Sequence, residues 1–83
     1  MSIRISLAQR FVVLAHRVDN WCVAEEGNDE HFQMLNLFVQ LCELGDQINT
    51  LSQDDALGQP RVEAIIEELN QIDKECADIV QRL

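Results

Sequence analysis

A regular stripe of apolar residues in the last third of the chain constrains the fold more than any other feature. In the segment VEAIIEELNQIDKECADIVQRL, apolar residues recur every three or four positions, as they do on one face of an α-helix. Two heptad positions stay apolar over three heptads: Val62, Ile65, Leu69, Ile72, Cys76, Ile79 and Leu83. Because such a seam is stable only against another apolar helix, the chain is expected to fold as packed helices.

Two earlier segments carry stripes of the same kind. In the first, residues 6–25, the stripe consists of Leu7, Phe11, Leu14, Val18 and Trp21. In the second, residues 29–51, it consists of Met34, Leu37, Leu41, Leu44, Ile48 and Leu51. The second segment also has an additional apolar edge, formed by Leu35, Phe38, Val39 and Cys42. This width predicts that the second helix contacts two neighbours.

Two short breaks separate the three segments. At the first, Gly27 suits a C-terminal cap, and Asn28 or Asp29 suits the N-terminal cap of the next helix. The second is the stretch SQDDALGQP, which contains Gly58 and ends at Pro60, a residue that suits the first turn of a helix over 60–83.

These elements predict a single all-α domain over residues 1–83. The expected architecture is an antiparallel three-helix bundle, or a helical hairpin with an amphipathic C-terminal helix, as a monomer or as an oligomer. Ile3 and Ile5 precede the first predicted helix and are interpreted as a frayed end.

The distribution of charge limits the partners that the chain can bind. The net charge is -9. Arg4, Arg10 and Arg17 precede every acidic residue, whereas the chain from Asp19 onward contains 15 acidic and three basic residues. Such a surface repels phosphates, so direct binding of nucleic acid is not expected. The chain has no apolar run long enough to span a membrane, and an odd number of cysteines without a secretory leader favours a cytoplasmic location.

The residues that usually carry chemistry do not form a recognisable site. Two histidines and three cysteines, His16, His31, Cys22, Cys42 and Cys76, form no pair three or four positions apart. We therefore expect no metal, no cofactor and no catalytic residue. Cys42 and Cys76 share faces with Leu and Ile and are predicted to be small buried apolar residues, whereas Cys22 is expected to be partly exposed.

The order of helices resembles that of a known family. The segment VVLAHRVDNWCVAEEGNDEHFQMLNLF, the break near Gly58 and the closing segment VEAIIEELNQIDKECADIVQRL are similar to the FliT-type flagellar export chaperones, among the small acidic chaperones of type III secretion. The resemblance implies a non-enzymatic protein that binds a secretion substrate, with a C-terminal helix that alternates between self-packing and a partner.

The C-terminal helix also supplies the predicted binding residues. Ile66 and Val80 lie beside the strict heptad positions, and packing against a single helix does not require them. The predicted contact positions are Ile66, Ile79, Val80 and Leu83. An acidic rim that selects a basic partner is predicted at Glu67, Glu68, Glu75 and Asp78.

Two other functions fit the same sequence. One is a phage-type inhibitor whose acidic surface occupies a nucleic-acid or protein site of a defence complex. The other is a structural homo-oligomer, such as a homodimer, in which the C-terminal helix completes a bundle with its copy. Solubility alone is also a sufficient explanation for the acidic composition, with no partner involved.

Overall fold

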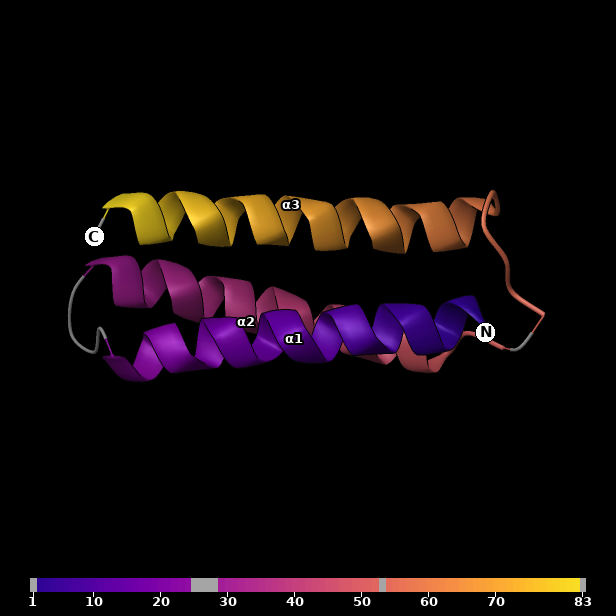
Figure 1. The fold of residues 1–83 in the computed structure, drawn as a ribbon, viewed down its shortest axis with the longest axis horizontal. Helices are drawn as coiled ribbons and strands as arrows, with labels where there is room; N and C mark the ends of the chain where they lie inside the picture. Colours follow the sequence, from indigo (N-terminus) through magenta and orange to yellow (C-terminus); the bar gives the residue numbers. More distant parts are fainter. Residues whose placement is uncertain (1, 25–28, 53, 83) are drawn as a thin grey trace.

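The computed structural model describes residues 2–24, 29–52 and 54–82. These contain three α-helices and no strand: α1 (Ile3–Ala24), α2 (Asp29–Asn49) and α3 (Pro60–Arg82). Successive helices run antiparallel in a rod of 43 × 18 × 17 Å, with α3 along one side of the α1–α2 pair (Figure 1). The predicted antiparallel three-helix bundle is confirmed.

The core consists of residues from the three predicted stripes, although Phe11 and Trp21 of the first stripe are only half-buried and pack against it. Its residues, each at most 6% exposed, are Leu7, Leu14, Val18, Met34, Leu37, Leu41, Leu44, Ile48, Leu51, Val62, Ile65, Leu69, Ile72, Cys76 and Ile79. Among the described residues, no polar or charged residue is buried. Burial of apolar area is therefore the main source of stability.

Helix α1 starts earlier than the sequence predicts. The hydroxyl of Ser2 accepts a hydrogen bond from the backbone N–H of Ile5 (3.3 Å), and the carbonyl of Ser2 accepts one from Ser6 (3.3 Å). Ser2 is thus an N-cap, so the interpretation of Ile3 and Ile5 as a frayed end is wrong. The expected caps at residues 27 and 28, and the expected helix end at residue 25, lie outside the described residues.

The end of α2 tightens before the connection to α3. Thr50 and Leu51 donate backbone hydrogen bonds to the carbonyls of Gln47 and Ile48 (both 3.1 Å), three positions back instead of four. Leu51 consequently follows the helix, although it was predicted to be its last residue, and it is still buried in the core. Helix α3 begins at Pro60, as predicted.

The additional apolar edge of α2 is only partly covered. Phe38 is half-buried and packs against the core, whereas Leu35 and Val39 are exposed. Cys42 is exposed too, so its predicted burial is wrong, while Cys76 is fully buried as predicted. The reason is that α2 contacts both other helices through its main stripe and Phe38, which leaves the rest of this edge without a neighbour.

Candidate functional site: an exposed apolar face on α1 and α2

A second apolar stripe runs along the outward side of each of the first two helices. On α1 it consists of Ile5, Ala8, Val12, Ala15 and Asp19, and on α2 of Phe32, Leu35, Val39, Cys42 and Asp46. In both helices the spacing alternates between three and four residues and the stripe ends on an aspartate. We call these ten residues the outer face.

The large side chains of the outer face are exposed to solvent. Ile5 and Val12 are each 51% exposed, Phe32 is 60% and Val39 is 58% exposed, and Leu35 is 39% exposed. Ala8 and Ala15 are half-buried at the base of the face. Single exposed apolar residues need no explanation, but an ordered row on two adjacent helices is typical of an interaction surface.

The outer face lies on the side of the bundle away from α3. On α1, the side chains that reach α3 are Arg10 and Arg17, which lie on one side of the core stripe. Val12 lies on the other side, above the contact between Phe11 of α1 and Gly45 of α2. There a shallow groove of about 350 Å³ runs along the α1–α2 seam, and it is lined by Phe11, Val12, Ala15, His16, Asp19 and Phe38.

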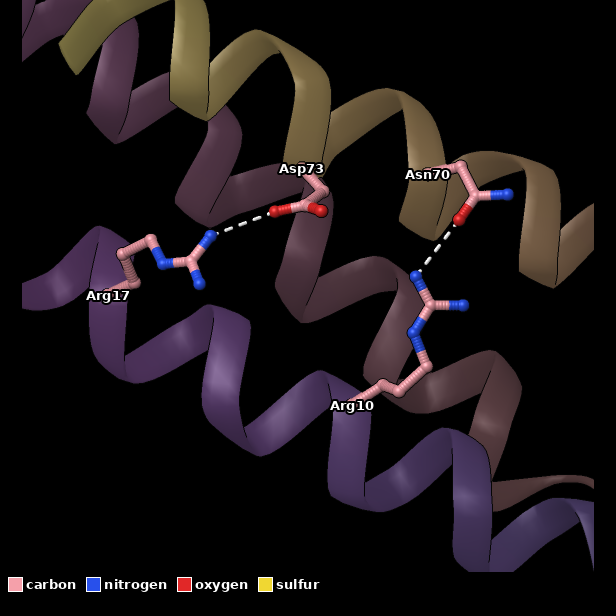
Figure 2. Close-up of polar contacts among 4 residues, drawn as sticks. All are labelled: Arg10, Arg17, Asn70 and Asp73. Carbon is pink, nitrogen blue, oxygen red and sulfur yellow. Dashed lines mark hydrogen bonds and ion pairs between the residues drawn. The ribbon is translucent and has the colours of Figure 1, made fainter.

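The opposite groove, between α1 and α3, is bridged by polar side chains. Figure 2 shows Arg10 Nη2 donating to Asn70 Oδ1 and Arg17 Nη1 donating to Asp73 Oδ1, each at 2.9 Å. Arg17 and Asp73 are both about half exposed, and exposed ion pairs contribute only about 0–1 kcal/mol to stability. Val13, 61% exposed, lines this groove above Leu14. We interpret the two bridges as contacts that orient α3 on α1.

Of the predicted contact positions, three are described and all three belong to the packing of α3. Ile79 is only 3% exposed and is part of the core. Ile66 and Val80 are half-buried and pack against the core. Each is seven positions from Asp73, so both lie on the same side of α3 as the contact to Arg17 of α1. Leu83 lies outside the described residues.

The predicted acidic rim is divided between two other sides of α3. Glu67 and Glu68 line a shallow depression on the outside of α3. Glu75 and Asp78 line the groove between α3 and α2, together with Gln40. The structure therefore does not bring the acidic residues together around Ile66 and Val80.

The sequence contained a signal for the outer face that the prediction did not use. Ile5 and Val12 are one heptad apart, and so are Phe32 and Val39, just as core residues are. On α1, Ala8 and Ala15 make the apolar pattern of the stripe less evident in the sequence. On α2, the apolar edge predicts a contact with another helix of the same chain.

The described residues contain no group of three or more His, Cys, Asp or Glu side chains that could hold a metal ion. In the same part of the chain, no helix combines the length and the apolar character that crossing a membrane requires. Comparison with protein-family models, with curated proteins and with solved structures yields no match. The resemblance to FliT-type export chaperones stays a prediction from the sequence.

Proposed function

We propose that the chain is a non-enzymatic protein-binding module, of the chaperone or adaptor type, and that its binding surface is the outer face of α1 and α2. One observation carries this proposal: five large apolar side chains, 39–60% exposed, are aligned in two adjacent stripes. Covering them with apolar atoms is favourable at about 25 cal/mol per Å² removed from water.

The geometry of the face favours helical segments as its occupants. Both stripes repeat every three and four residues, which is the spacing that the side chains of a packed helix require. The groove beside Phe11 and Phe38 runs along the seam between the two helices. Recognition of an amphipathic helix in an apolar groove is a common mode of protein binding.

In this proposal α3 is a scaffold and not the binding helix. Its apolar stripe, from Val62 to Ile79, is already 0–3% exposed in the core. Using it for a partner would require opening the bundle and exposing the core of the chain. The outer face needs no such rearrangement, because its side chains are already exposed.

Site-specific photo-crosslinking in cells that express the chain natively tests this proposal. We place p-benzoylphenylalanine at position 39 of the outer face and, as the control, at position 67, which is exposed on the outside of α3. We expect a discrete adduct from position 39 that is lost when Phe32→Glu is added, and none from position 67. Adducts from position 67 alone would overturn the proposal and favour an acidic binding surface on α3.

A further inference from the structure

We propose that the groove between α1 and α3 is a second binding site, and that its occupant is an acidic amphipathic helix of a partner protein. The groove has a volume of about 480 Å³. On α1 it extends from Ser6 to Arg17, and on α3 it is lined by Leu69 and Asp73. Because it lies on another side of the bundle from the outer face, this inference does not depend on the proposed function.

The groove has the apolar base and the length that a helix requires. Leu14 and Leu69 are buried core residues at its base, and Val13 beside them is 61% exposed. Of the three helix pairs, α1 and α3 pack least closely. Ser6 and Arg17 are separated by about 16 Å along the helix axis, which is about three turns. A groove of this length between two helices of a bundle is where an additional helix packs.

Charge distinguishes this groove from the others. It is the only one of the grooves and depressions described above whose lining residues include arginine or lysine. The others are lined by acids: Asp19, Glu67 and Glu68, or Glu75 and Asp78. On a chain with a net charge of -9, an acidic segment is therefore repelled by the other grooves and attracted to this one.

The two arginines of the groove keep donors for a partner. Arg10 donates to the side-chain amide of Asn70, which is neutral, and among the described residues Arg10 has no ion pair (Figure 2). Arg17 donates to Asp73 through Nη1. A guanidinium carries five N–H donors, and both arginines are exposed, so each can also bind a carboxylate from outside the chain.

The spacing of the arginines favours a helix over a small anion. Arg10 and Arg17 are one heptad apart, about 10 Å along α1, and both side chains reach toward α3. The exposed Val13 lies between them in the sequence. A partner helix with two acids one heptad apart and an apolar residue between them matches this pattern. A small aliphatic carboxylate has a single anionic group and engages only one of the two arginines.

The test uses three synthetic helical peptides that share one leucine stripe. Beside the stripe, the peptides carry glutamate, glutamine or lysine at one position of each heptad. Each peptide is titrated into the isotope-labelled full chain, and the changes in the NMR spectrum give both the dissociation constant and the location of the contact. Decanoate is the probe for a small aliphatic carboxylate.

Two matched pairs of variants locate the site. Arg10→Gln changes the groove, and Arg4→Gln removes the same charge from an exposed arginine of α1 that does not line it. Val13→Glu changes the groove, and Val12→Glu adds the same charge to the outer face. The two valines are 61% and 51% exposed, so neither substitution removes a core side chain. Circular dichroism verifies that all four variants keep their helices.

We expect the glutamate peptide to bind most tightly and the lysine peptide most weakly. For the glutamate peptide, Val13→Glu should raise the dissociation constant at least about tenfold, and Arg10→Gln about threefold, the scale of one exposed ion pair. Val12→Glu and Arg4→Gln should each leave it within about twofold. High salt should reduce the difference between the glutamate and glutamine peptides.

Several results would overturn the inference. One is a lysine peptide that binds as tightly as the glutamate peptide, and another is no binding of any peptide up to about 1 mM. An effect of Val12→Glu or Arg4→Gln as large as that of its partner variant would place the contact elsewhere. Binding of decanoate without binding of the glutamate peptide would make the occupant a small ligand. None of these results decides the role of the outer face, which the crosslink from position 39 tests separately.

Discussion

The ring of Phe11 lies directly against Gly45, so that a Cβ atom added to this glycine would be 2.8 Å from Phe11 Cζ. Glycine inside a helix lowers stability by about 1 kcal/mol relative to alanine. Here the missing side chain allows the Phe11 ring of α1 to lie over the backbone of α2. The contact lines the α1–α2 seam beneath the outer face.

This contact predicts that the effect of Gly45→Ala depends on residue 11. In the wild-type chain, the gain in helix propensity should be offset by displacement of the Phe11 ring, so the free energy of unfolding should change by less than about 1 kcal/mol. In a Phe11→Leu background the ring is absent, and Gly45→Ala should stabilise the chain by about 1 kcal/mol. Urea unfolding of the four proteins measures the coupling, and equal effects of Gly45→Ala in both backgrounds would contradict it.

Gly58 is required for a different reason. Its φ is +92°, and an added Cβ would meet no atom within 4 Å, so the constraint is the backbone conformation alone. Gly58→Ala should therefore lower the free energy of unfolding by about 1–2 kcal/mol, the cost of this region for an L-residue. Gly58→Asn is the control, because asparagine tolerates positive φ and should cost less. An alanine variant as stable as the wild type would show that the loop changes its conformation freely.

Substitution of Ile66 and Val80 should affect folding. Both are half-buried against the core, so Ile66→Ser and Val80→Ser should each lower the free energy of unfolding by about 1–2 kcal/mol. Leu69→Ala, in the core, should cost about 2–5 kcal/mol, and the exposed Val13→Ser should stay within about 0.5 kcal/mol. Chemical unfolding measures all four. If Ile66→Ser and Val80→Ser were as neutral as Val13→Ser, these residues would instead be available for a partner.

The cysteines should differ in reactivity. In a Cys22→Ser background, exposed Cys42 should react rapidly with a thiol reagent such as Ellman's reagent, whereas buried Cys76 should react only as the chain unfolds. Cys42→Ser should remove the fast phase. A fast phase that survives Cys42→Ser would contradict the burial of Cys76.

Much of the fold follows from apolar spacing alone. The stripe from Val62 to Ile79 predicted a buried seam, and each of its residues is 0–3% exposed. The start of α3 at Pro60 was predicted because proline suits the first turn of a helix. The start of α1 was missed because the N-cap depends on a hydrogen bond from a single serine, Ser2, which apolar periodicity does not reveal.

By itself, the sequence determined that three amphipathic helices bury their main stripes against one another, since periodicity is a local property of each segment. Only the tertiary structure decided which of the surplus apolar edges is covered. In the sequence, Ile66 beside the seam of α3 and Val39 beside that of α2 look alike. In the bundle, Ile66 is half-buried and Val39 is exposed. Helix α3 covers only one side of the α1–α2 pair, where its apolar stripe is buried and Asp73 contacts Arg17. Contacts between residues so far apart in the chain are not visible in the local periodicity of any one segment.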